Sequence, residues 1–257
     1  MRKRLVVIVG AVAGIAVAAF AALYAYVTLS NRDAPPPVSL TPQTPIAAAT
    51  SSGTAPSAAT SSGSASGGAA GTSCDTAAVD GTWTVSTASG QSFAGYRVTE
   101  RLASLPAQSD AVGRTTAVSG TVTIAGTNAS AADVTADLTR LTSNEQRRDN
   151  FIRQNGLESD TYPTAEFKLS SSLSFGSVPA TGRAVSATAH GQLTLHGRTR
   201  SVDIPVQAQR TCAGIEIVGS LPVTFSDYGM SPPSIGGFVS VEDHGTMELK
   251  LELVRSA

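Results

Sequence analysis

The chain has 257 residues, of which 41% are hydrophobic, 14% charged and 5% aromatic, and its formal net charge is −1. Within residues 74–257, 14 Lys and Arg stand against 18 Asp and Glu, and this weakly acidic balance without a basic stripe argues against nucleic acid as a partner. Two cysteines and no CxxC motif exclude a Cys₄ zinc site and a thioredoxin-type redox centre.

The first segment, residues 1–4, contains three basic side chains and precedes an uncharged apolar run over residues 5–29. A helix of that length spans roughly 37 Å, enough to cross a hydrocarbon core of about 30 Å. The basic residues predict a cytoplasmic N-terminus, so the rest of the chain is expected outside the cell membrane as a single-pass protein. The alternative is a cleaved signal sequence, because Ala19-Phe20-Ala21 has the A-x-A form of a cleavage site, and the protein is then secreted.

Residues 30–73 are almost all Pro, Ser, Ala, Thr and Gly, without apolar periodicity. Such a segment cannot offset the entropy of ordering, which predicts a disordered linker. A flexible chain of this length reaches roughly 35–40 Å on average. The linker is interpreted either as a spacer that lets the domain sample the membrane or wall, or as a segment that merely resists folding.

A folded domain is predicted over residues 74–257. Cys74 stands at its start and Cys212 in its last third, and an exported domain meets an oxidising compartment. We therefore predict a Cys74–Cys212 disulfide. The alternatives are two free thiols or an intermolecular bridge from Cys74.

From Gly81 onward, short stretches alternate apolar and polar residues and are separated by Gly, Pro, Ser, Asp or Asn, a pattern typical of β-strands. The last one is the clearest: Met247, Leu249, Leu251 and Leu253 alternate with charged residues. Earlier segments of this kind lie at residues 83–85, 93–99, 118–124, 134–138, 165–169, 193–195, 202–208 and 221–225. About eight strands with one apolar face each must stack as two sheets or close into a barrel, so the fold class is all-β.

One segment breaks this pattern. Residues 144–154 are charged and lack Gly and Pro, with Ser143 as a candidate N-cap and Gln146 at the capping-box position. They predict one short helix that Gly156 would end, before Tyr162-Pro163 imposes an extended conformation.

Three motifs in order, Arg148-Asp149 with Phe151-Ile152, Tyr162-Pro163-Thr164-Ala165-Glu166-Phe167, and residues 191–199 (GQLTLHGRT), resemble the YceI-like family of polyisoprenoid-binding proteins. Gly81-Thr82-Trp83 also fits, and the resemblance covers most of residues 81–255. It implies an eight-stranded antiparallel, lipocalin-like barrel whose elongated apolar cavity takes a long isoprenoid chain. The chain departs from the family in having Phe151 where the family commonly has His, and in having a membrane anchor with a long linker.

These features together predict a membrane-tethered extracytoplasmic protein that sequesters or carries a polyisoprenoid, either a quinone or a polyprenyl lipid. The lipid would be its ligand, and no other cofactor is expected. The alternative is a cell-envelope interaction module whose barrel is filled by side chains. A nucleophile elbow, HExxH, P-loop or paired-carboxylate motif is not found in the sequence, so an enzyme is not expected.

Candidate ligand-binding residues are the inward-facing aromatic and aliphatic residues and two arginines that could hold a head group. They are Tyr96, Arg147, Arg148, Phe151, Tyr162, Phe167, Leu193, Leu195, Phe225 and Tyr228. Arg147 and Arg148 also fit a solvated helix face. His196 is interpreted as a hairpin-turn residue, and the spacing of the three histidines predicts no metal site.

Overall fold

The computed structural model describes residues 34–43, 78–88, 90–102, 108–235 and 239–256. Within these ranges, no helix is both long and apolar enough to cross a membrane. The predicted span over residues 5–29 and most of the predicted linker lie outside them, as does Cys74.

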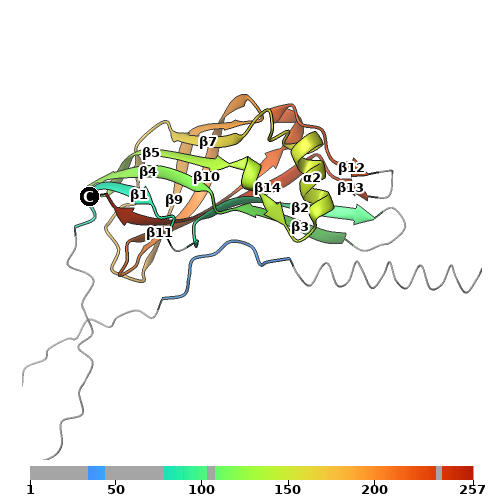
Figure 1. The fold of residues 1–257 in the computed structure, drawn as a ribbon. Coiled ribbons are helices and arrows are strands. Elements are labelled where there is room, and N and C mark those ends of the chain that lie inside the picture. The colour runs from blue at the N-terminus through green and yellow to red at the C-terminus, as the bar shows by residue number, and fades with distance from the viewer. Residues whose placement is uncertain (1–33, 44–77, 89, 103–107, 236–238, 257) are drawn as a thin grey trace, which may run out of the picture.

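The described part of the domain is an antiparallel β-structure with one short α-helix, confirming the predicted class (Figure 1). Its strands are β1 (Gly81–Val85), β2 (Phe93–Leu102), β3 (Gln108–Thr115), β4 (Val118–Ala125), β5 (Asn128–Asp137), β6 (Thr142–Ser143), β7 (Thr164–Leu169), β8 (Leu173–Ser174), β9 (Ala184–Leu195), β10 (Arg198–Arg210), β11 (Ile215–Thr224), β12 (Ser234–Ile235), β13 (Val239–Val241) and β14 (His244–Arg255). The other elements are η2 (Leu138–Arg140), α2 (Gln146–Phe151), the π-helical turn η3 (Ile152–Gly156) and η4 (Phe225–Tyr228).

Eight strands close into a barrel in the order β1-β4-β5-β7-β9-β10-β11-β14, with β14 returning to β1. The long strand β14 makes this closure possible because it serves two partners. Residues 246–250 pair with β2, and residues 253–255 pair with β1. Strands β2 and β3 pair with each other and so continue the wall beyond β1 and β4.

The alternating pattern of the sequence sets the inside of the barrel. In β14, Leu251 and Leu253 are almost fully buried at 2% and 1% exposure. They join Trp83, Val118 and Ile215 in a core cluster near the end formed by β1 and β4. A second cluster around Leu138, Leu193 and Tyr228 lies toward the end that carries α2.

The helix is shorter and differently capped than the sequence predicts. α2 covers Gln146–Phe151, and Glu145 rather than Ser143 is its N-cap, accepting from the backbone N–H of Arg147. The carboxylate of Asp149 instead accepts two bonds from Ser143, from its N–H at 2.9 Å and its hydroxyl at 2.6 Å. Asp149 therefore ties the helix to β6. The following turn ends at Gly156, as predicted.

Residues 34–43, here called the strap, differ from the predicted disordered linker. They run in an extended conformation along the outer face of the barrel, beside β11, β14 and β2 (Figure 1). The physical reason lies in the partners: barrel side chains 62 to 209 residues away in sequence hydrogen-bond to the strap. Composition alone does not reveal such long-range contacts.

Candidate functional site

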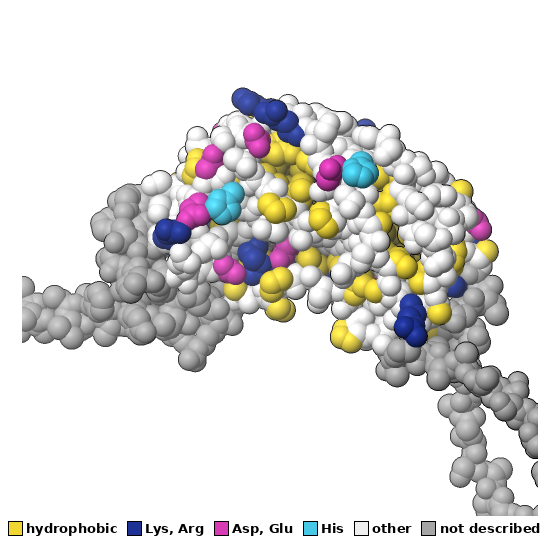
Figure 2. Space-filling view, turned by 180° about the vertical axis from the view of Figure 1, so that it is seen from behind, with side chains coloured by type: hydrophobic (Ala, Val, Ile, Leu, Met, Phe, Trp, Pro, Cys, Tyr) yellow, Lys and Arg dark blue, Asp and Glu magenta, His cyan; other side chains and the backbone are white. Residues whose placement is uncertain are grey.

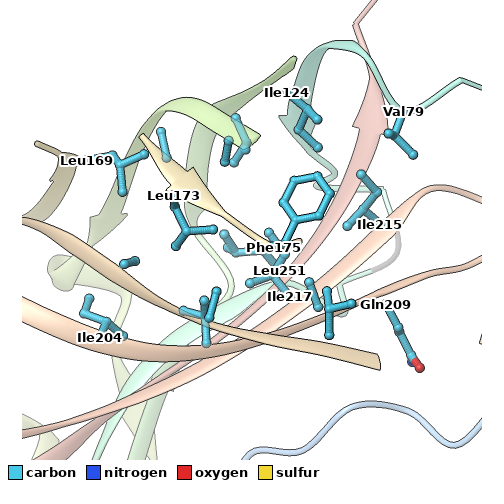
Figure 3. Close-up of a pocket in the computed structure, with 18 of the residues that line it drawn as sticks. Val79, Ile124, Leu169, Leu173, Phe175, Ile204, Gln209, Ile215, Ile217 and Leu251 are labelled. Carbon is cyan, nitrogen blue, oxygen red and sulfur yellow. The ribbon is translucent and has the colours of Figure 1, made fainter. Parts of the chain in front are cut away.

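The barrel encloses an apolar cavity, whose largest part we call the outer chamber. Its volume is about 1060 Å³, including the space that opens to solvent. In Figure 3, side chains from several strands, among them Ile124, Leu169, Ile204 and Leu251, point into this shared space. Phe175 enters it from the segment after β8. Apart from Gln209 and Arg210, every lining residue is apolar.

Two further chambers continue the cavity toward the α2 end. The inner chamber, of about 800 Å³, shares Val134, Phe167, Ile204 and Leu249 with the outer chamber. The rim chamber, of about 470 Å³, shares Tyr96 and Leu157 with the inner one. Because each chamber shares wall residues with the next, the three lie in series along the barrel, and together they are called the lumen.

Small residues of β9 make room for this lumen. Ala187 and Ala189 face inward in the outer chamber, where larger side chains would fill it. At Gly191 a Cβ atom would lie 2.3 Å from the ring of Phe167, so only glycine lets this ring lie against the strand. Phe167 lines both the outer and the inner chamber and therefore marks their junction.

Tyr96 places a polar group inside this apolar lumen. It lines the inner and rim chambers, and its buried hydroxyl lies beside Ser143 and the charged groups of Arg148, Asp149 and Glu100 at the α2 end. Burial raises the pKa of Tyr96, so the phenol remains protonated and keeps its donor. An O–H donor at the border between the apolar lumen and this polar cluster suits a ligand that carries one oxygen acceptor.

Five of the ten candidate residues line the lumen. Tyr96 and Phe167 are described above, Leu193 and Leu195 line the inner chamber, and Phe225 lines the rim chamber. The other five, Arg147, Arg148, Phe151, Tyr162 and Tyr228, line none of the three chambers. Whether the first five bind a ligand stays a prediction.

The two arginines of α2 differ in their surroundings. The Arg148 guanidinium donates two hydrogen bonds to Glu100 of β2, from Nε at 3.0 Å and from Nη2 at 3.2 Å. Both side chains are largely shielded, with 17% and 18% of their surface exposed. Arg147 is exposed on the helix. In this arrangement Arg148 fastens α2 across the barrel end.

Tyr162 and Tyr228 belong to a packed corner at the turn between β9 and β10. His196 has a positive φ of 50° and Gly197 one of 69°, which places both in the left-handed region of a tight hairpin turn. The imidazole packs against the Tyr162 ring, with centroids 4.3 Å apart, and Nδ1 lies 3.2 Å from the carbonyl oxygen of Tyr228. These contacts give His196 the structural role that the sequence indicates.

Polar chemistry of other kinds is sparse in the part of the chain that is described. Within it, no three His, Cys, Asp or Glu side chains gather where they could hold a metal ion. On the face shown in Figure 2, charged side chains are scattered among hydrophobic and uncharged ones. His190 Nδ1 lies 2.6 Å from Oδ1 of Asp203. Cys212 follows β10, and its predicted partner lies outside the described ranges.

Comparison with known proteins identifies the domain. Residues 83–253 match the YceI-like domain, a match that includes all eight barrel strands in whole or in part. The chain belongs to the YceI-like family. No curated protein matches it.

The domain is similar to several solved structures. A polyisoprenoid-binding domain from Saccharophagus degradans, implicated in plant cell wall breakdown, is 17% identical with a TM-score of 0.50, and the match covers 68% of this chain and 98% of that one. BcnA of Burkholderia cenocepacia is 20% identical with a TM-score of 0.46, covering 65% and 98%. The YceI protein of Campylobacter jejuni is 16% identical with a TM-score of 0.43, covering 56% and 84%.

Sequence reasoning missed most of the aliphatic wall of this YceI-like lumen. Ala187, Ala189 and Val206 line the outer chamber, yet in sequence they resemble any strand residues with an inward side chain. Gly191 was visible in the GQLTLHG motif, but its contact with Phe167 joins two strands and has no local signal. The only sequence cue for the wall was the unusual share of small residues in β9.

Proposed function

We propose that this YceI-like protein holds a single long isoprenoid chain in the barrel lumen, and that it binds this lipid without catalysing a reaction on it. The observation that carries the proposal is the series of three adjacent chambers, whose walls are almost entirely apolar. Burying apolar chain gains roughly 0.8 kcal/mol per CH₂ before the entropic cost of binding, so shape and desolvation supply the affinity. The polyisoprenoid-binding description of the Saccharophagus domain supports this ligand class.

Tyr96 gives the proposal a polar contact. Its hydroxyl would donate to a carbonyl or phosphate oxygen of the head group at the α2 end, while the hydrocarbon chain extends through the inner and outer chambers. A quinone and a polyprenyl phosphate both offer such an oxygen. No general acid, base or nucleophile is needed for this role.

The proposal includes the location that the sequence predicts. Residues 5–29 would anchor the chain in the cell membrane, with the barrel on the extracytoplasmic side. This arrangement supports sequestering or carrying a membrane lipid, because the predicted linker, residues 30–73, would keep the barrel close to the membrane that contains the lipid. The alternative, a cell-envelope module with a side-chain-filled barrel, predicts that the chambers take up no lipid.

The test is native mass spectrometry of the full chain in lipid nanodiscs, followed by organic extraction of the bound species. A lumen-filling variant, Ala187→Phe, is compared with Thr188→Phe, which places the same ring on the outward side of β9. We expect a bound isoprenoid or uptake of added menaquinone or polyprenyl phosphate in the wild type and Thr188→Phe, and at least tenfold less in Ala187→Phe. Equal uptake by both variants, or none by the wild type, would refute a lumen site.

A further inference from the structure

The outer face of the barrel beneath the strap carries polar side chains that are buried. Glu216 and Glu248 point outward from β11 and β14, yet they are 0% and 3% exposed, and Gln209 of β10 is 4% exposed. Charged groups on the outside of a small barrel are ordinarily solvated. Here the strap lies beside them and bonds to the same side chains (Figure 1).

The first contact region lies under the prolines of the strap. Arg97 donates to the Pro35 carbonyl at 2.7 Å, and Arg114 donates to the Pro36 carbonyl at 3.2 Å. The same two arginines bind the buried carboxylate of Glu248, at 2.9 and 3.1 Å. Proline has a carbonyl acceptor and no N–H donor, so a proline run matches a surface of guanidinium donors.

The second contact region lies under Thr41. The Thr41 N–H and hydroxyl both donate to Oε1 of Glu216, at 2.9 and 2.8 Å, and the Thr41 carbonyl accepts from Gln209 at 2.7 Å. Lys250 completes the cluster, 2.8 Å from Glu216 and 3.0 Å from the Thr41 hydroxyl. In Figure 3 the Gln209 amide points away from the chamber, consistent with this bond to the strap.

The two regions impose opposite demands on the peptide. Acceptors are required at positions 35 and 36, while two donors and one acceptor are required at position 41. Any residue supplies the carbonyls used at 35 and 36, including proline, whereas position 41 requires a residue with an N–H, and its hydroxyl contact requires Ser or Thr. The burial of Glu216, Glu248 and Gln209 beneath these contacts marks the face as a binding surface.

We propose that this face of the barrel, formed by β2, β3, β10, β11 and β14, is a binding surface for one extended proline-containing segment, and that the strap is its resident occupant. When the strap is docked, it divides the tether, the segment between the apolar run and the barrel, into a short part before the strap and a longer part after it. Four residues separate the end of the apolar run at residue 29 from Ala34, and the five Cα–Cα steps between these positions span at most about 17 Å. With the strap released, the tether would comprise residues 30–77, and a flexible chain of that length reaches about 35–40 Å on average.

Docking also orients the barrel. Ala34 and Pro35 lie beside Asn144, just before α2, whereas Thr41 lies at the opposite side of the face, near Glu216. The chain that leads back to the predicted anchor thus departs on the α2 side, where the rim chamber lies. This consequence rests on the proposed membrane anchor and lipid site; the docking of the strap does not.

The test measures strap docking in the full chain in nanodiscs by single-molecule energy transfer. Fluorophores are attached through non-natural amino acids at position 31 and at the exposed Asn150 of α2, or at position 31 and the exposed Ser177, so that both cysteines are left intact. Thr41→Pro removes both strap donors to Glu216. Ser39→Pro is the matched control, because Ser39 is exposed and makes no hydrogen bond among the described residues.

We expect one narrow, short-distance population for the 31–150 pair in the wild type and in Ser39→Pro, and a longer distance for the 31–177 pair. In Thr41→Pro, both fluorophore pairs should show broad distance distributions with similar mean distances. The proposal is overturned if the wild type and Thr41→Pro give distance distributions of the same width, whether both are broad or both are narrow. Lipid extracted from the same samples reports separately on the lumen, so an empty barrel with a docked strap refutes only the proposed function.

Discussion

The aromatic ring of Phe167 occupies the space that a side chain at Gly191 would need. A Cβ atom built at position 191 lies 2.3 Å from Cε2 of the ring and 2.6 Å from the carbonyl oxygen of Lys168. Gly191 pairs with Leu169 on the neighbouring strand, so the ring crosses diagonally over the glycine. This contact fixes Phe167 at the junction of the outer and inner chambers.

Gly191→Ala should therefore displace the Phe167 ring into the junction. We expect a loss of about 1–3 kcal/mol in the free energy of unfolding, as for other overpacked cores, and reduced uptake of a long isoprenoid. Denaturant unfolding and a menaquinone titration measure the two effects. Adding Phe167→Leu to Gly191→Ala should recover part of the stability; a purely additive double variant would show that the two sites are not coupled in this way.

Tyr96→Phe should separate the stability of the empty barrel from its preference for a head group. Because the buried hydroxyl lies beside the Ser143 side chain, its removal should change the stability of the ligand-free protein by about 1 kcal/mol or less. The same change should weaken binding of menaquinone several-fold and leave binding of a hydrocarbon isoprenoid of equal length unchanged. Calorimetry with both ligands checks this prediction, and an equal loss for both would remove the proposed hydroxyl contact.

Arg148→Ala should loosen α2, whereas Arg147→Ala should not. Arg148 loses two bonds to a largely shielded Glu100, which we expect to lower the free energy of unfolding by about 1–2 kcal/mol, between the values typical of surface and buried pairs. Hydrogen exchange of α2 amides locates the effect. If Arg147→Ala instead weakened binding of polyprenyl phosphate more than Arg148→Ala, the exposed arginine would be the head-group contact.

The sequence allowed the all-β class to be predicted because β-strands with one buried face leave a period-two pattern, clearest in β14, whereas the closed barrel was implied only by the resemblance to the YceI-like family. The prediction failed where that pattern is weak. β3 was missed because Gly113 and the charged Asp110 and Arg114 interrupt its apolar residues. The first half of β9 was missed because its inward residues are small, which is also what keeps the lumen open.

The strap shows a second limit of sequence reasoning. Its Pro-rich composition indicates a segment without a core of its own, and this part of the reasoning holds for its local structure, since it forms no helix or strand. Its order depends on Glu216, Glu248 and their cationic partners on distant strands. Five of the ten candidate residues lie outside the chambers for a similar reason: aromatic residues such as Tyr162 pack in corners as readily as they line a cavity.

The predicted Cys74–Cys212 disulfide has a direct test. Mass spectrometry of the non-reduced protein should find the two cysteines in one cross-linked peptide pair. In the chain-entropy account, a closed loop of this length stabilises the fold by about 4–5 kcal/mol, so reduction should lower the midpoint of thermal unfolding markedly. Two free thiols, or a dimer cross-linked through Cys74, would make the prediction wrong.

Glu216 and Glu252 face each other across β11 and β14, and their pKa values shift in opposite directions. Burial alone would raise the pKa of Glu216, but hydrogen bonds from Lys250, Gln209 and Thr41 outweigh it and hold the pKa below its ordinary value of 4.5. Burial and the neighbouring Glu216 charge raise the pKa of Glu252. The cluster thus stabilises one carboxylate at the expense of the other.

The signs of these shifts define a pH experiment. A lowered folded pKa means that Glu216 contributes full stability above 4.5 and loses it as the pH falls through the folded value. The raised pKa of Glu252 means that its charge destabilises the fold at neutral pH, and that this penalty disappears in acid. Glu252→Gln should therefore raise the free energy of unfolding at pH 7 by a few tenths to about 1 kcal/mol, the range for a like-charge cross-strand pair. Urea unfolding from pH 3 to pH 7 should show this gain shrinking toward acid, whereas a gain independent of pH would assign it to packing rather than to charge.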